Sequence, residues 1–274
     1  MPDLIYHYTT ADGLLGILQD ASLLATDMHF LNDRSEWEYQ VKLAVGCANW
    51  LDTLDLDATQ EPFARHWAFW LRNFSIVENE RLHCVSCFCA HGDLLSQWRG
   101  YAGSEGFAIG FDPQTVFNTI HRAEPVIYSP HDQQYLLRAQ LTEILNSWPG
   151  RHRLPREGEF DGVGGAMLEL VSQTLARFKD EGFSEEQEWR VWTSAPLTTP
   201  FGPQRPAVRV NRNRLVPYVP LNFDASRQHP VKSIVVGPSP DPKGSLRATS
   251  VLLGSLGLHE TVELHESKIP WRIS

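Results

Sequence analysis

The sequence predicts one α+β domain that extends over residues 1–274. Apolar residues recur every three or four positions in several segments, which is typical of amphipathic helices. Between these segments lie short runs of alternating apolar residues, rich in aromatic and β-branched types, which are typical of strands. Pro and Gly are spread along the chain instead of being gathered into a linker, so no domain boundary is indicated.

The composition indicates a soluble globular protein of the cytoplasm. Hydrophobic residues make up 42% of the chain and charged residues 21%, and nowhere do 18 apolar residues run together, so neither disorder nor a membrane span is expected. The first ten residues lack the basic and apolar regions of a signal peptide. Four cysteines are too few for a disulfide scaffold, which favours a reducing compartment. The net charge of -9 argues against non-specific nucleic-acid binding as the main activity.

The N-terminal part of the chain predicts a strand over residues 4–8 and then three helices. Thr10 is a suitable cap for the first helix, which runs to about Ala21. Asp33 and Glu36 have capping-box spacing and precede a second helix that ends near Leu51. Apolar residues at spacings of three and four indicate a third helix and are expected in the core, namely Phe63, Trp67, Trp70, Leu71 and Phe74.

From residue 82 the pattern changes to strand, helix and strand, and the second strand has Phe107, Ile109 and Phe111 in alternation. Another strand is predicted at 125–129, followed by a long helix that ends near Trp148. Residues 149–162 are predicted to form a loop, which is the best candidate for a mobile segment or lid, although an irregular surface loop is the commoner explanation. A helix through 167–178 and one between 244 and 257 are also expected, with strands at 185–194, 207–211, 215–221, 232–237 and 261–267.

The first candidate for chemistry is the segment Tyr6-His7-Tyr8-Thr9-Thr10. It lies where a strand ends and a helix begins, a place where functional polar groups are often found. A histidine between hydroxyl-bearing residues can orient a ligand or stack on it. A structural histidine with satisfied hydrogen bonds fits the same pattern and is the commoner case.

The second candidate is the acidic segment that contains Glu186 and Glu188. The two residues are two apart on the predicted strand, so their side chains would share a face with Arg190 and Trp192. Each carboxylate would then raise the pKa of the other, which makes one of them a plausible proton-sharing or cation-stabilising group. An exposed acidic strand paired with Arg190 is the structural alternative.

The third candidate lies in the segment 93–101, which combines aromatic rings with a cation near a strand–helix junction, namely Gln97, Trp98, Arg99 and Tyr101. Such a set could stack a flat ring and hold a phosphate group. The alternative is that the segment only presents the apolar face of a short helix.

The fourth candidate superficially resembles a zinc site and comprises His83, Cys84, Cys87, Cys89 and His91. A tetrahedral site usually needs a second pair of ligands at suitable spacing, and the sequence has none, so a strand with buried cysteines is favoured and no metal is expected. The motifs GxGxxG, GxxxxGK[ST] and GxSxG, each in the required context, are also missing. Their absence argues against a Rossmann cofactor site, a P-loop and an α/β-hydrolase.

Four strings together resemble a bacterial family known only as a domain of unknown function: LIYHYTTADGLLGILQDASLLATDMHFLND, CFCAHGDLLSQWRGYAGSEGFAIGFD, FSEEQEWRVW and SKIPWR. That family is remotely similar to the ADP-ribosyltransferase superfamily, whose members cleave NAD and transfer ADP-ribose to protein or nucleic acid. The resemblance implies a split, mixed or antiparallel β-sheet core with flanking helices.

The resemblance also implies roles for residues of the first strand and of the acidic segment. His7, with Tyr8 and Thr9, resembles the first-strand histidine that hydrogen-bonds the ribose of NAD. Glu188 resembles the catalytic glutamate at the start of a late strand, where a carboxylate stabilises the positive charge that develops on the ribose. Glu186 occupies the position that helps to choose the acceptor in some transferases.

For nicotinamide stacking the resemblance leaves three aromatic residues open, namely Phe88, Trp98 and Tyr101. Arg99 would meet the pyrophosphate with its forked guanidinium. The tyrosine of the superfamily's second strand has no clear counterpart here.

The function implied by this resemblance is NAD-dependent ADP-ribosyl transfer to an unidentified protein or nucleic-acid acceptor, with NAD as a substrate. A role as a toxin or defence effector, with a neutralising partner protein, would follow from the superfamily alone. NAD hydrolysis is the close enzymatic alternative, because water would only have to replace the acceptor. A non-catalytic nucleotide- or partner-binding domain is the alternative from another class, and the oligomeric state is not indicated.

Overall fold

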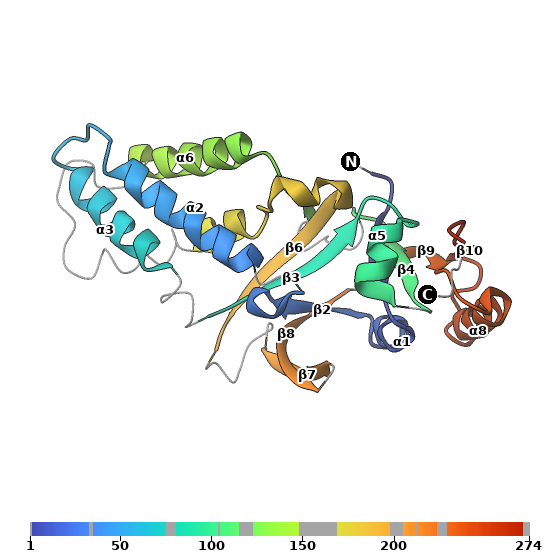
Figure 1. Cartoon of the computed structure of the whole chain (residues 1–274). Coiled ribbons are helices and arrows are strands. Elements are labelled where there is room, and N and C mark those ends of the chain that lie inside the picture. Colours follow the sequence, from blue (N-terminus) through green and yellow to red (C-terminus); the bar gives the residue numbers. More distant parts are fainter. Residues whose placement is uncertain are drawn as a thin grey trace.

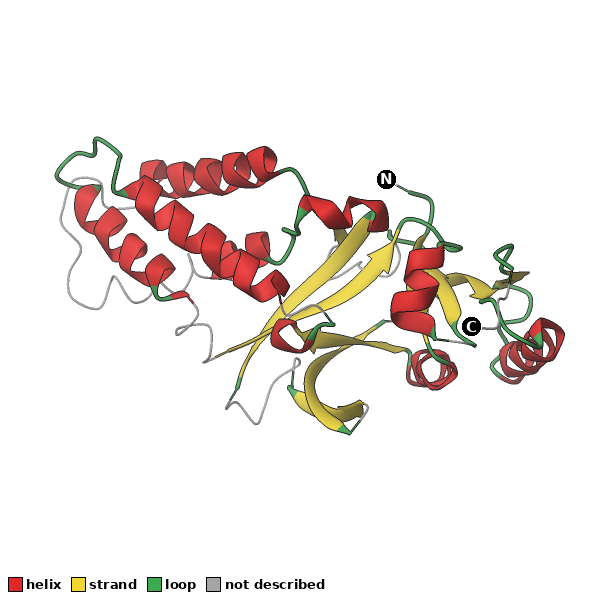
Figure 2. Ribbon diagram, viewed as in Figure 1, coloured by secondary structure: helices red, strands yellow, loops and turns green. Residues whose placement is uncertain are grey.

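A large, mostly antiparallel β-sheet forms the centre of the molecule (Figure 2). The computed structural model describes residues 2–32, 35–74, 81–103, 105–114, 123–147, 169–197, 205–211, 213–223 and 229–270. Hydrogen-bonded neighbours follow the order β10 (Glu263–Glu266), β9 (Val231–Val236), β4 (Phe107–Phe111), β1 (Ile5–Thr9), β3 (Arg81–Cys89), β2 (Ser22–Asp27), β8 (Arg214–Asn222) and β7 (Ala207–Asn211). In addition, β6 (Glu188–Pro196) pairs with β3, and β5 (Ala123–Pro125) pairs with β6.

Helices flank this sheet in separate groups, so the predicted α+β class and its mostly antiparallel sheet are confirmed (Figure 1). One group lies to one side of the sheet and contains α2 (Ser35–Leu51), α3 (Glu61–Arg72), α6 (Pro130–Ser147) and the helical residues 169–175. The other helical elements are α1 (Ala11–Asp20), η1 (Met28–Phe30), α5 (Leu95–Gln97), the π-helical turn η3 (Trp98–Ala102), the 3-10 turn η4 (Glu181–Glu186) and α8 (Pro242–Ser255). In the part of the chain that the structure describes, no helix combines the length and apolarity needed to cross a membrane.

The buried side chains form two large apolar clusters. One lies between the sheet and α1 and α8, and includes Ile5, Phe88 and Phe111. The other lies within the helical group of α2, α3, α6 and residues 169–175, and includes Trp67 and Leu141. The sheet and the helical group therefore have separate apolar cores, and the two meet where α2 contacts the sheet.

Local patterning accounts well for the helices. The Thr10 hydroxyl accepts a hydrogen bond from the amide of Gly13 at 3.3 Å, which caps α1 as predicted. The expected aromatic stripe of α3 is also found, with Phe63 and Trp67 almost fully buried. The capping-box residue Asp33, the predicted loop 149–162 and Trp148 lie outside the described residues.

Two strand predictions need correction. The structure has a strand, β2, directly after α1, where the sequence pattern indicated none; Ala21 adopts a left-handed conformation with φ of 47° and turns the chain into it. Leu24 and Ala25 of β2 continue the three- and four-residue spacing of the apolar residues of α1, so periodicity did not separate the two elements. The strand predicted at 125–129 is shifted, because β5 covers 123–125 and Ile127 makes only an isolated bridge to Phe178.

Candidate functional site

The sheet is split at β3, because β1 and β2 pair with the same edge of that strand at different places. On its other edge β3 pairs with β6 over its full length, from Arg81 to Cys89. On the split edge β1 contacts β3 at the pair Tyr6–Cys89, and β2 contacts it at the pairs Thr26–Val85 and Asp27–Cys84. Neither strand pairs with residues 86–88, so β1 and β2 diverge there, and α1 connects them.

His7 lies at this split. Its Nδ1 is 2.9 Å from the carbonyl oxygen of Cys87, and because a carbonyl can only accept, Nδ1 must carry the proton. Burial lowers the pKa of His7, the Cys87 carbonyl opposes this, and the positive charge of Arg209 lowers the pKa further. The ring is therefore neutral near pH 7, and its Nε2 is an acceptor with no hydrogen-bond partner within the described ranges.

Glu188 begins β6 and is 5% exposed. Its Oε1 accepts from Arg190 Nε at 2.7 Å, and its Oε2 accepts from Arg190 Nη2 and from Lys179 Nζ, both at 3.0 Å. These bonds use three of the roughly four acceptor positions of a carboxylate, and the Cys87 thiol is a further, weak donor. The residue is thus held rigidly rather than left free in solvent.

Two further carboxylates complete what we call the ionic cluster, which comprises Glu36, Lys179, Glu186, Glu188 and Arg190. Lys179 Nζ lies 2.6 Å from Glu186 Oε2 and 3.2 Å from Glu36 Oε1, and Arg190 Nη2 lies 2.7 Å from Glu36 Oε2. The cluster joins α2, the chain after the helical residues 169–175, η4 and β6. It therefore connects the helical group to the sheet with three carboxylates and two cations.

The acidic segment differs from its prediction in two respects. Glu186 lies in the turn η4 and not on a strand face with Glu188 and Arg190. The two carboxylates also do not raise each other's pKa symmetrically. Burial raises the pKa of Glu186 in spite of Lys179, whereas for Glu188 the effect of burial is outweighed by Arg190 and Lys179, which lower its pKa to about 2. Ion pairing decides this difference.

This lowered pKa predicts how stability depends on pH. Because Glu188 titrates below its ordinary 4.5 in the folded state, its ionised form stabilises the fold above pH 4.5, and this contribution is lost as the pH falls towards 2. Relative to wild type, Glu188→Gln should lose on the order of 3 kcal/mol of unfolding free energy near pH 6. Urea unfolding at pH 6, 4.5 and 3 should show this difference shrinking; a difference independent of pH would contradict the ion pairing.

The strand register places His7 and Glu188 on opposite faces of the sheet. Tyr6, Cys89 and Glu188 are directly paired across β1, β3 and β6, so their side chains share one face. His7 is one residue further along β1 and points with Phe88 towards the other face, where the ring centroids are 5.8 Å apart. The two predicted partners therefore do not face each other directly. One ligand could contact both only at the split.

Tyr8 and Trp98 are built into the protein core. Their rings meet edge to face at 4.7 Å, the Tyr8 hydroxyl donates to the carbonyl of His91 at 2.8 Å, and Trp98 Nε1 donates to Asp93 Oδ1 at 2.8 Å. Phe88 is buried as well. These contacts favour a structural role for all three rings.

The side chains of Tyr101 and Arg99 are exposed on the η3 turn, and Tyr101 is 40% exposed. Burial of part of the ring raises the pKa of the Tyr101 hydroxyl, and the negative charge of Glu186 raises it further. This side chain therefore lies within electrostatic reach of the ionic cluster. Thr9 is half-buried at the end of β1, beside the first turn of α1. Tyr101 is thus the predicted aromatic residue that a ligand could most readily reach.

Sequence reasoning missed Lys179 and Tyr128. Lys179 is only 2% exposed although it is a lysine, and the Tyr128 hydroxyl accepts a hydrogen bond from the amide of Glu188 at 2.9 Å. No local pattern marks Tyr128. For Lys179 the sequence offers one weak signal, its position after an apolar helical stripe and before an acidic run.

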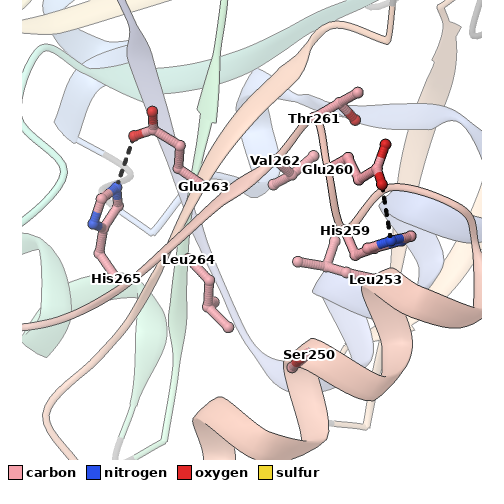
Figure 3. Close-up of a pocket in the computed structure, with 9 residues that line it drawn as sticks. All are labelled: Ser250, Leu253, His259, Glu260, Thr261, Val262, Glu263, Leu264 and His265. Atoms are coloured by element: carbon pink, nitrogen blue, oxygen red, sulfur yellow. Dashed lines mark hydrogen bonds and ion pairs between the residues drawn. The ribbon is translucent and has the colours of Figure 1, made fainter.

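A pocket of about 540 Å³ lies elsewhere, between α8 and β10 (Figure 3). Its lining residues are Ser250, Leu253, His259, Glu260, Thr261, Val262, Glu263, Leu264 and His265. Figure 3 shows the His265–Glu263 and His259–Glu260 pairs at different sides of this pocket. Within the described residues, no group of three or more potential metal ligands is suitable for a metal ion. None of the predicted site residues lines the pocket.

Residues 97–191 match the model of a family described as a protein of unknown function, DUF2971. The predicted resemblance to a family of unknown function is confirmed over this segment. The DUF2971 segment contains Tyr101, Lys179, Glu186, Glu188 and Arg190, and thus most of the ionic cluster. No curated protein and no solved structure matches the chain. The similarity to ADP-ribosyltransferases consequently stays a prediction.

Proposed function

We propose that this protein cleaves NAD and transfers the ADP-ribose unit to a protein or nucleic-acid acceptor, on an ADP-ribosyltransferase-like fold. The observation that carries the proposal is the split in the sheet, at which neutral His7 offers its Nε2 as an acceptor that no described residue uses. Glu188 lies two strands away, roughly 10 Å by the spacing of strands. A ligand that enters the split edge-on could therefore contact residues of both sheet faces.

The chemistry requires a permanently ionised carboxylate and a fixed ribose. When the bond between nicotinamide and C1′ breaks, its electron pair leaves with nicotinamide and the ribose becomes positively charged. Glu188, ionised because of its lowered pKa, would stabilise that charge by accepting a hydrogen bond from a ribose hydroxyl in place of the weak Cys87 donor. His7 Nε2 would accept from a second hydroxyl, and the acceptor's nucleophile would then bond to C1′ and lose its proton.

Tyr101 is the aromatic residue that we assign to nicotinamide. It is exposed and close to the charges of Glu186 and Glu188, whereas Phe88 and Trp98 are buried in apolar clusters. A ring that is already enclosed on both faces cannot accept a stacked ligand without moving.

One observation favours a second candidate, a non-catalytic nucleotide- or partner-binding domain. Arg190 and Lys179 occupy most of the acceptor capacity of Glu188, as they would in a purely structural ion cluster. NAD hydrolysis remains the enzymatic alternative to transfer, because it would use the same residues with water as the nucleophile.

The deciding experiment uses the full-length protein with NAD labelled in the adenylate part. We expect release of nicotinamide together with label on an added protein or nucleic acid. Free ADP-ribose as the sole labelled product would instead identify a hydrolase. If the protein neither binds nor consumes NAD, the enzymatic proposal is wrong and the binding-domain candidate stands.

A further inference from the structure

Arg209 of β7 reaches across the sheet towards the split. Its Nη2 donates to the Thr26 hydroxyl of β2 at 2.9 Å, and its guanidinium lies 6.0 Å from the ring centroid of Tyr218 on β8. These contacts fix the guanidinium from two strands, and a cation at this distance from a tyrosine ring is attracted to it. The side chain is thus positioned before any ligand binds.

The charge of Arg209 has no counter-charge within the described ranges. Its Nε is buried and has no hydrogen-bond partner there, and none of the described carboxylates lies within ion-pair distance of the guanidinium. Burial lowers the pKa of Arg209, because partial removal from water disfavours the charge. The chain has 33 acidic and 24 basic side chains, yet the contacts that the structure describes for this half-buried arginine are to a hydroxyl and a ring. Burying a charge without a partner is costly, so an anionic ligand would stabilise this arrangement.

The position of Arg209 relative to His7 follows from the strand pairs. Thr26, which holds Arg209, pairs with Val85 of β3, and His7 binds the carbonyl oxygen of Cys87. Val85 and Cys87 are two residues apart on one strand, or about 7 Å. One anchoring point thus directly precedes the unpaired residues 86–88 and the other lies within them, and the charge of Arg209 is close enough to lower the pKa of His7.

From this geometry we propose that Arg209, with the hydroxyl of Thr26, binds a phosphate group of a nucleotide ligand at the split. The forked N–H groups of arginine match the oxygens of phosphate, and the Thr26 hydroxyl, which accepts from Arg209, keeps its own proton for donation. Because Thr26 pairs with Val85, its side chain shares the sheet face of Glu188, so the ligand's ribose has to enter the split to reach His7. The assignment of this ligand to NAD rests on the proposed function, but the phosphate site does not.

Arg99, which sequence reasoning assigned to the pyrophosphate, is less well prepared for this role. Its side chain is exposed on the η3 turn, and no contact orders it within the described residues. An exposed, unheld arginine loses more conformational entropy on binding than one that is already positioned. The phosphate contact is therefore assigned to Arg209 in place of Arg99.

The test compares ADP with adenosine by isothermal titration calorimetry on the full-length protein. Wild type should bind ADP at least tenfold more tightly than adenosine, and Arg209→Gln should lose most of this difference without changing the affinity for adenosine. Arg209→Lys should restore only part of it, because lysine lacks the fork. Arg247→Gln, which removes the same charge from an exposed position on α8, is the matched control and should behave as wild type.

Thermal unfolding of each variant establishes that it is folded before binding is compared. Equal affinities of wild type for ADP and adenosine, no binding of either, or an ADP affinity that Arg209→Gln leaves unchanged would each overturn the phosphate site. The proposed function fails separately. ADP binding that depends on Arg209, in a protein that does not consume NAD, supports the phosphate site and rejects the catalysis.

Discussion

Replacing Arg190 with Met is expected to lower the free energy of unfolding by about 3–5 kcal/mol. Arg190 is 2% exposed and holds both Glu188 and Glu36, and it also donates to the carbonyl oxygen of Ala176 at 2.9 Å. Methionine fills a similar volume but leaves two buried carboxylates with only Lys179 as a cation. An uncompensated buried charge is far more costly than the net gain from the original pair.

The matched control is Arg65→Met on α3. Arg65 pairs with Glu61 on the helix surface, where the two side chains are 75% and 52% exposed, so the change should cost no more than about 1 kcal/mol. Urea unfolding at pH 7 measures both variants. Arg190→Lys should fall between Arg190→Met and wild type, because it keeps the charge but cannot bridge two carboxylates in the same way. Equal unfolding midpoints for Arg190→Met and Arg65→Met would show that the ionic cluster does not hold the helical group to the sheet.

Glu188→Gln is expected to slow NAD cleavage by roughly 10²–10³-fold, the usual cost of removing one electrostatic stabiliser of a transition state. The amide is neutral, so it cannot offset the positive charge that develops on the ribose. His7→Asn should have a smaller effect, about tenfold or less, because it removes one neutral hydrogen bond. The rate of nicotinamide release under saturating NAD is the measurement.

Glu185→Gln is the control for this loss of rate. Glu185 precedes Glu188 by three residues and is exposed, with one bond of 3.3 Å from the Ser96 hydroxyl. It should retain the wild-type rate. Because Glu188→Gln also weakens the ionic cluster, its rate is compared with that of Arg190→Met at a temperature at which both are folded. If Arg190→Met and Glu188→Gln lose activity in proportion to their loss of stability, Glu188 acts through the fold and does not meet the substrate.

Local sequence patterns predicted most of the elements that carry the candidate site. The helices α1, α2 and α3 and the strands β1, β3 and β6 lie close to their expected positions, because amphipathic periodicity reports which side of an element is buried. The same signal failed at β2. Its apolar residues continue the stripe of α1, and only pairing with β3 and β8 makes the segment a strand.

Local sequence patterns were also insufficient to describe the candidate site residues. Patterning identified Glu186 and Glu188 but treated them as equivalent, since the cations that distinguish their pKa values were not visible locally. Arg190 is two residues from Glu188, yet its second carboxylate, Glu36, is 154 positions away in the chain. Lys179 was missed altogether because nothing in its own segment distinguishes a buried lysine from an exposed one.

The sequence by itself determined the α+β class, the main helices and strands, the resemblance to a family of unknown function over residues 97–191, and the short list that contained His7 and Glu188. Only the tertiary structure decided that these two side chains leave opposite faces of the sheet, that Glu188 is held within an ionic cluster, and that Arg209 reaches the split without a counter-charge from any described residue. The physical reason is the range of the interactions. Periodicity and capping act between residues a few positions apart, whereas strand register and ion pairing depend on segments that only the folded chain brings together.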